Sequence, residues 1–101
     1  MEINIKTLPD STVAELVGRL DTPASLEIAP AFESLYEKAS GTVVIDCSKL
    51  EYISSSGLRL FLTLRKSASD KGGRVIVRSI CPEIRNVFMM TGFLNLFQIE
   101  D

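Results

Sequence analysis

Three consecutive hydroxyl side chains, Ser54-Ser55-Ser56, stand where an apolar stretch typical of a strand is followed by one typical of a helix. A serine oxygen at a helix start can accept a hydrogen bond from an unpaired backbone N–H group and so cap the helix. A serine there can also carry a phosphate, because the helix N-terminus stabilises the added negative charge. Serines are so frequent at helix starts that capping is the simpler interpretation of the run by itself.

The segments on either side of the serines must position them. The β-branched run from Thr42 to Asp46 predicts a strand buried on both faces between helices, at the centre of a sheet. After the serines, small or apolar residues recur on one face of an expected helix at Gly57, Leu60, Phe61, Leu64 and Ala68. Gly72-Gly73 suits a turn from that helix into the next strand, so we expect the helix to end near Lys71.

The first forty residues predict a hairpin followed by a helix. Ile3 and Ile5 alternate with polar residues, and Pro9-Asp10-Ser11 provides a turn into a second, antiparallel strand over 12–19. Asp21-Thr22-Pro23 is a helix-start signal, and Ser40-Gly41 ends the helix. We expect its apolar face at Leu26, Ala29, Phe32, Leu35, Tyr36 and Ala39.

One proline leaves that helix open to two interpretations. Pro30 falls inside the periodic stretch, where it removes a backbone donor and clashes with the preceding turn. Either the helix is kinked at Pro30, or its regular part begins near residue 29.

The remaining elements set the fold class. The segment Arg74 to Ser79 predicts a strand, residues 82–91 predict a third helix closed by Gly92, and Phe97 to Ile99 is a candidate last strand. Strands that alternate with helices after an initial hairpin predict an α/β fold with a mixed central sheet and helices packed on it. With 101 residues, we expect a single domain over 1–101.

Composition disfavours several classes of function. The chain has no histidine, and Cys47 and Cys81 lie far apart, so no metal site, disulfide or cofactor is expected. Both cysteines are expected to be packing residues in a reducing compartment. Asp21, Asp46 and Glu51 could converge at strand ends, but such acids are usually solvated, and an enzyme is disfavoured.

The charge and hydropathy pattern points to a cytoplasmic protein. The net charge is −2 with scattered basic residues, so nucleic acid is not an expected partner. No apolar stretch is long enough to span a bilayer, and we expect no membrane insertion. We expect the free protein to be a monomer.

Five motifs occur in order along almost the whole chain: Gly18-Arg19-Leu20-Asp21, Val43-Val44-Ile45-Asp46, Tyr52-Ile53-Ser54-Ser55-Ser56-Gly57-Leu58, Gly72-Gly73, and Cys81-Pro82 through Thr91-Gly92-Phe93. Their order and spacing resemble the STAS domain, the family of anti-sigma factor antagonists. The resemblance implies partner switching, in which the unphosphorylated antagonist binds an anti-sigma factor that is also a serine kinase. Phosphorylation ends that complex, and a serine phosphatase restores it.

The resemblance also assigns roles around the serines. The family's phosphorylated hydroxyl precedes the motif glycine, which maps it onto Ser56, and Gly57 would let the kinase approach the backbone closely. Ser55 matches the family's usual serine, whereas Ser54 replaces an aspartate that is common there. This departure leaves room for an alternative, a STAS subunit of a transport or other regulatory complex without phosphorylation. A nucleotide-binding or hydrolytic module would rest only on the α/β pattern and on Asp21 and Thr22 near the serine segment.

Further partner contacts are expected around Ser56. The candidates are Asp21 and Thr22 at the first helix start, and the exposed side of the following helix at Arg59, Leu62 and Thr63. Met89 and Met90 lie off the apolar stripe of the third helix. They either form an adaptable apolar patch for a partner or fill gaps in the core.

Overall fold

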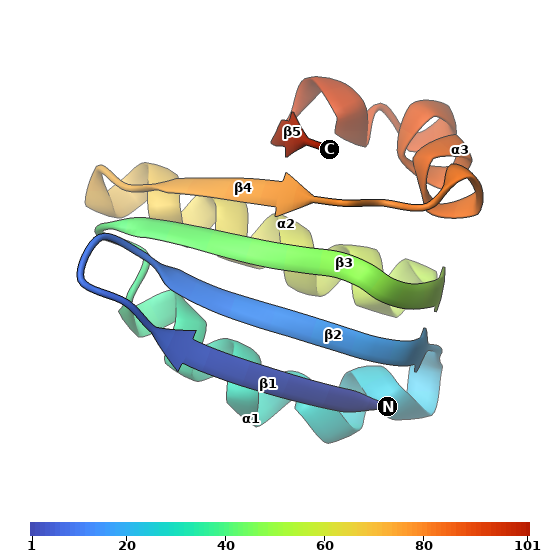
Figure 1. Cartoon of the computed structure of the whole chain (residues 1–101), viewed down its shortest axis with the longest axis horizontal. Coiled ribbons are helices and arrows are strands. Elements are labelled where there is room, and N and C mark those ends of the chain that lie inside the picture. The colour runs from blue at the N-terminus through green and yellow to red at the C-terminus, as the bar shows by residue number, and fades with distance from the viewer.

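A computed structural model describes residues 1–101 and shows the expected mixed sheet (Figure 1). The elements in chain order are β1 Glu2–Thr7, β2 Thr12–Leu20, α1 Thr22–Glu37, β3 Thr42–Ile53, α2 Ser55–Lys71, β4 Arg74–Arg78, α3 Pro82–Thr91, a short 3-10 helix Phe93–Asn95 and β5 Gln98–Glu100. The strands lie in the sheet in chain order. β1 is antiparallel to β2, and the other neighbouring strands are parallel. Every parallel connection passes through a helix, as parallel neighbours require.

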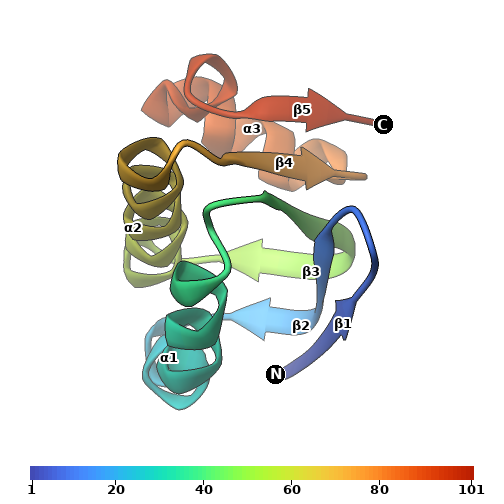
Figure 2. The same ribbon diagram turned by 90° about the vertical axis from the view of Figure 1, so that its left-hand side faces the viewer.

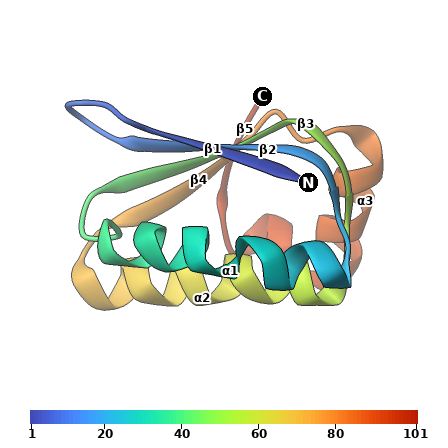
Figure 3. The same ribbon diagram turned by 90° about the horizontal axis from the view of Figure 1, so that it is seen from below.

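The helices cover only one face of the sheet. Figures 2 and 3 show α1 and α2 packed together against the same side of the strands. Ile45 on β3 points into this helix layer and is fully buried, whereas its neighbour Asp46 is on the open face. β3 is at the sheet centre as predicted, but the expectation that helices cover both of its faces is wrong. Val44 and Ile76 are register partners on the open face and lie outside the main core. They are nevertheless only 7 % and 5 % exposed, because each covers the flank of the other.

Aromatic rings join the three helices into one core. The Phe61 ring on α2 lies 6.0 Å from that of Phe32 on α1 and 6.1 Å from that of Phe88 on α3, centroid to centroid. Phe93 and Phe97 extend the cluster to the C-terminal segment. Aromatic rings at these separations stabilise the fold by more than the burial of their surface alone. They therefore hold the three helices together as one layer.

α1 differs from the sequence prediction in two respects. Leu26 is 76 % exposed and does not belong to the apolar face, because it is two residues from the buried Ile28 and therefore on the far side of the helix. α1 also runs without interruption through Pro30, so of the two alternatives left open by the sequence, a regular start near residue 29 is wrong. Pro30 is exposed, which leaves the carbonyl that lacks its N–H partner accessible to water.

β3 is longer than predicted. It continues past Asp46 to Ile53, and its pairing with β2 contains two register shifts, one between Glu15 and Val17 and one after Gly18. Such irregularities bend a strand without ending it. The polar residues of this second half concealed it from the sequence pattern, which showed only the β-branched first half.

The Gly72-Gly73 turn between α2 and β4 is confirmed, and one of its glycines is sterically required. A Cβ atom on Gly73 would overlap the backbone carbonyl oxygens of Ala39 and Gly41. The adjacent Arg74 N–H donates to the Gly41 carbonyl at 3.0 Å, so this backbone cannot move aside without losing that bond.

We expect Gly73→Ala to lower the free energy of unfolding by roughly 2 kcal/mol or more, because the overlap is with backbone atoms. In a domain of this size the thermal midpoint would fall by about 8 to 16 °C. Gly41→Ala is the matched control, since a Cβ there meets no atom within 4 Å. Equal midpoints for the two variants would contradict the steric assignment.

Candidate functional site

The site is built from two strand-to-helix junctions that lie side by side at the right of Figure 1. Leu20 at the end of β2 and Ile53 at the end of β3 are register partners in the parallel pair. Asp21 and Ser54 follow them directly, so the two helices begin at the same edge of the sheet. The Ser54 N–H donates to the Leu20 carbonyl at 2.8 Å and joins the junctions.

Each junction has its own helix cap. Asp21 Oδ1 accepts a hydrogen bond from the Ala24 N–H at 2.9 Å, which confirms Asp21 as a helix-start residue. Ser54 Oγ accepts from the Gly57 N–H at 3.2 Å and caps α2. Both are the interaction expected of an N-cap side chain.

The capping serine is therefore distinct from the two that follow it. Ser54 is 9 % exposed, whereas Ser55 is exposed and Ser56 is half-buried. Ser55 and Ser56 are the first two residues of α2, and neither hydroxyl is bonded to another protein group. The two interpretations of the serine run, helix capping and a hydroxyl available for phosphate, thus apply to different residues. Ser54 is the cap, and the hydroxyls of Ser55 and Ser56 are free.

Gly57 faces inward. A Cβ atom there would lie 2.7 Å from Leu20 Cγ and 3.0 Å from Ile53 Cγ1, and the residue is buried. The missing side chain lets the first turn of α2 pack closely against β2. The sequence predicted that Gly57 lets a kinase approach the backbone, and the structure gives the missing side chain a packing role.

Four predicted contact residues point outward near the junctions. Thr22 is exposed at the start of α1, and Arg59, Leu62 and Thr63 are exposed along α2. Arg59 follows Ser56 by three residues, a spacing that makes the two side chains neighbours on a helix surface. The Thr63 hydroxyl donates to the Arg59 carbonyl at 3.0 Å.

The methionine pair belongs to a separate surface. Met89 is 61 % exposed and Met90 is 85 % exposed, so the alternative that they fill gaps in the core is wrong. They follow the buried Phe88 on α3, whereas the serines lie at the start of α2. The structure thus brings Asp21, Thr22 and the serines together at two adjoining junctions, while Met89 and Met90 are on a different helix.

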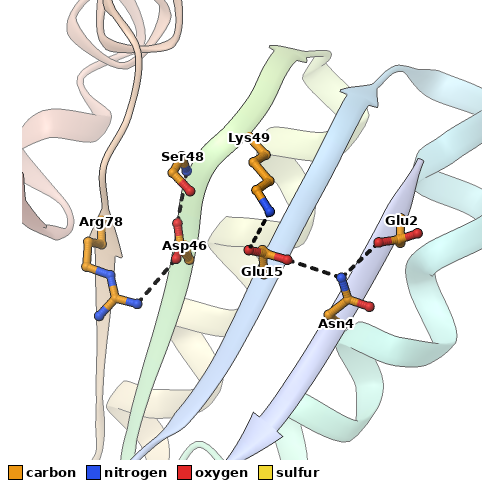
Figure 4. A network of polar contacts seen from close by, with 7 residues as sticks. All are labelled: Glu2, Asn4, Glu15, Asp46, Ser48, Lys49 and Arg78. Atoms are coloured by element: carbon orange, nitrogen blue, oxygen red, sulfur yellow. Dashed lines mark hydrogen bonds and ion pairs between the residues drawn. The ribbon is translucent and has the colours of Figure 1, made fainter.

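The three carboxylates considered from the sequence do not converge. Asp46 lies on the open face, where it accepts hydrogen bonds from the Ser48 N–H at 3.0 Å and from Arg78 Nη2 at 3.3 Å (Figure 4). Burial opposes ionisation of Asp46, but these hydrogen bonds and the Arg78 charge outweigh it and hold its pKa below the usual value. Asp46 is thus a paired structural anion, while Asp21 is a cap.

The cysteines differ in exposure. Burial raises the pKa of Cys47 to about 12, so its thiol stays protonated and packs as an apolar group. Cys81 is partly exposed at the N-terminus of α3, and its Sγ lies 3.7 Å from the Leu50 carbonyl oxygen.

The surface hollows are elsewhere. Nothing in the sequence pointed to a hollow of about 450 Å³ between the second half of β3 and the start of α3, lined by Arg19, Ser48, Lys49, Leu50, Glu51, Cys81 and Glu83. None of the hollows includes Ser54, Ser55 or Ser56. The free hydroxyls therefore lie on an outer surface that suits contact with another protein better than enclosure of a small molecule.

Comparison with known proteins decides the family. The model of the STAS domain matches residues 2–101. The chain belongs to the STAS family. A Bordetella bronchiseptica protein named as an anti-sigma factor antagonist, BtrV, is 27 % identical over 101 residues, which are 100 % of this chain and 87 % of that protein.

Solved structures share the STAS fold. A Thermotoga maritima protein described as an anti-sigma factor antagonist superposes with a TM-score of 0.87 at 21 % identity, covering 98 % of this chain and 86 % of the other. The anti-sigma factor antagonist SpoIIAA in its unphosphorylated form has a TM-score of 0.76 at 22 % identity, covering 99 % and 88 %. In this STAS protein, no helix combines the length and the apolar character needed to cross a membrane.

We expect Ser54→Ala to lower the free energy of unfolding by about 1 kcal/mol, because it leaves the Gly57 N–H without its cap. Ser54→Asp keeps an acceptor at the same place and should retain most of the stability. Ser55→Ala is the control, since its exposed hydroxyl has no partner. Denaturant titration measures all three, and a loss in Ser55→Ala as large as in Ser54→Ala would contradict the assignment of the cap.

Proposed function

We propose that this STAS protein is an anti-sigma factor antagonist that acts by partner switching in the cytoplasm. It binds an anti-sigma factor serine kinase while unphosphorylated, is released when Ser56 is phosphorylated, and is restored by a serine phosphatase. It is a regulatory binding protein rather than an enzyme. The observation that carries the proposal is the free hydroxyl of Ser56 beside a helix start that Ser54 already caps.

The first turn of α2 can hold a phosphate on Ser56. The N–H groups of the first helical residues, Ser55 and Ser56, have no partner within the helix, and the helix dipole favours an anion there. The first turn contains no acidic residue, and Arg59 provides a positive charge three residues on. The dipole stabilises such a charge by about 0.3 to 1 kcal/mol, so the fold should tolerate it.

The same charge opposes a docked partner. A phosphoserine carries about −1.5 to −2 at neutral pH. A partner carboxylate at about 4 Å would then be repelled by about 4 kcal/mol at an effective dielectric constant of about 20. This repulsion corresponds to nearly a thousandfold in affinity, so the complex should be lost well before the fold.

The proposed contact surface surrounds the junctions. Thr22, Arg59, Leu62 and Thr63 offer a mixed polar and apolar surface next to Ser56, and the relatives named as antagonists support a protein partner for it. SpoIIAA, which shares the fold, has been solved in a phosphorylated form as well, with a TM-score of 0.74. Met89 and Met90 form a second exposed apolar surface, which we assign to a peripheral contact.

Labelling by the cognate kinase should occur at Ser56. We expect Ser56→Ala to abolish incorporation of phosphate, whereas Ser55→Ala, which removes an equally unbonded hydroxyl one residue away, should retain it. Mass spectrometry of the wild-type protein locates the phosphate. A phosphate on Ser54 or Ser55 would overturn the assignment, and no labelling by any co-purifying kinase would favour the alternative of a STAS subunit without phosphorylation.

Phosphorylation should separate binding from stability. Calorimetric titration of the kinase with phosphorylated protein should show affinity reduced by roughly a hundredfold or more. The thermal midpoint should change by less than about 8 °C, which corresponds to about 1 kcal/mol at this size. Ser56→Asp should also weaken binding to the kinase, but by less, because an aspartate carries less negative charge than a phosphoserine. A larger fall in midpoint with unchanged affinity would show that Ser56 is structural.

A further inference from the structure

The outer edge of β1 has no partner. β1 pairs only with β2, and it forms one margin of the molecule together with α1, which runs behind it (Figures 1 and 3). Its residues are largely exposed, including Ile5 at 36 %. The backbone N–H and C=O groups on such an edge are a template for another strand.

The sequence of β1 is complementary to itself. We propose that β1 pairs antiparallel with β1 of a second copy of this chain, about a two-fold axis at Asn4. In that register Glu2 of each copy lies opposite Lys6 of the other, on the open face of the sheet. Ile3 of each copy lies opposite Ile5 of the other, on the helix side. A lysine on an edge strand usually discourages pairing, but here an acidic residue of the second copy neutralises it.

No other antiparallel self-pairing of β1 matches the charges. Residues that face each other across a two-fold axis have numbers whose sum is constant, and only an axis at Asn4 places Glu2 against Lys6. The side chains of Glu2 and Asn4 lie on the open face, where the Asn4 amide donates to Glu2 at 2.9 Å and to Glu15 at 3.2 Å (Figure 4). Lys6 shares this face by alternation and has no ion-pair partner within its own chain.

α1 presents a matching stripe on the same margin. Lys38 Nζ donates to Thr7 Oγ1 at 3.0 Å, so the side of α1 that carries Lys38 faces β1. Helical spacing places Ser34, Ala31 and Glu27 on that stripe. In an antiparallel helix pair, Glu27 of one copy would face Lys38 of the other, and the small Ala31 would face Ser34, which allows close approach of the two helices.

The two elements define the same axis. The distance from Thr7 back to Asn4 along a strand is about 10 Å. The same distance along a helix is about six or seven residues, which leads from Lys38 back to about residues 31–32. The stripe of α1 is self-complementary about a point between Ala31 and Ser34. Strand and helix therefore support one dimer, in place of the monomer expected from the sequence.

The dimer extends the proposed function without depending on it. Antiparallel pairing joins the two five-stranded sheets into one and places the two Ser56 residues at opposite ends of the assembly. Each copy could then bind a kinase independently, because the β1 edge does not include the junctions.

Sedimentation equilibrium of the full chain over a range of concentrations tests the register. We expect a reversible dimer in the wild type. Glu2→Lys and Lys6→Glu should each weaken dimerisation by roughly tenfold or more, because both symmetry-related pairs become like-charged. The double variant Glu2→Lys/Lys6→Glu should restore it, because opposite charges face each other again.

Lys66→Glu is the matched control, since it reverses an exposed charge on α2 and should leave dimerisation unchanged. Thermal unfolding of each variant verifies that it is folded. A wild type that is monomeric up to millimolar concentration would overturn the proposal, as would a double variant no better than the single ones. Neither result bears on Ser56 labelling, so failure here is distinguishable from failure of the proposed function.

Discussion

β2 and β3 are parallel neighbours, and this pairing determines where the serine site lies. Parallel strands need a crossover, so each strand is followed by a helix that returns along the sheet. The two helices consequently begin at the same edge, where the Ser54 N–H bonds to the Leu20 carbonyl at 2.8 Å. Without a side chain on Gly57, the first turn of α2 packs directly on Leu20. The serine segment is therefore attached to the sheet centre at Ser54, while Ser55 is exposed and Ser56 is half-buried.

This attachment separates the helix cap from a free hydroxyl within three consecutive residues. Ser54 is almost buried and its hydroxyl is used in the cap, whereas the Ser56 hydroxyl makes no hydrogen bond within the protein. A charge added to Ser56 would meet unpaired N–H groups and the nearby Arg59 rather than a packed core. A chain in which one serine served both purposes could not change its charge without disturbing its helix.

The sheet itself is asymmetric, and its two faces present different chemistry. One face is closed by α1 and α2, while the other exposes a polar network in which Asp46 pairs with Arg78 and Glu15 with Lys49 (Figure 4). Paired charges keep this open face hydrated and disfavour nonspecific association. The edge of β1 is different, because its Glu2 and Lys6 have no ion-pair partner within the chain. The proposed pairing would direct association to this edge, whereas the serines adjoin β2 and β3.

Local sequence determined the elements and their order. The β-branched run before Asp46, the helix-start signal at Asp21 and the glycine turn at Gly73 act through short-range sterics and hydrogen bonds, so their patterns are visible along the chain. The order and spacing of the motifs identified the STAS fold, and with it the expectation that Ser56 accepts phosphate. The prediction failed where local signals were mixed. Polar residues concealed the second half of β3. Leu26 matched the helical spacing of the apolar residues, but its side chain faces solvent.

Only the tertiary structure decided which serine caps α2, which way Gly57 faces and which sheet face is open. The cap is a local hydrogen bond, but the bond from the Ser54 N–H to the Leu20 carbonyl holds Ser54 at the helix start. The direction of Gly57 and the open face depend on contacts between residues far apart in sequence, such as that between Leu20 and Gly57. No periodicity records such a contact. The free edge of β1 and its alignment with α1 likewise exist only once the strands are assembled, because an edge is defined by the absence of a neighbour in space.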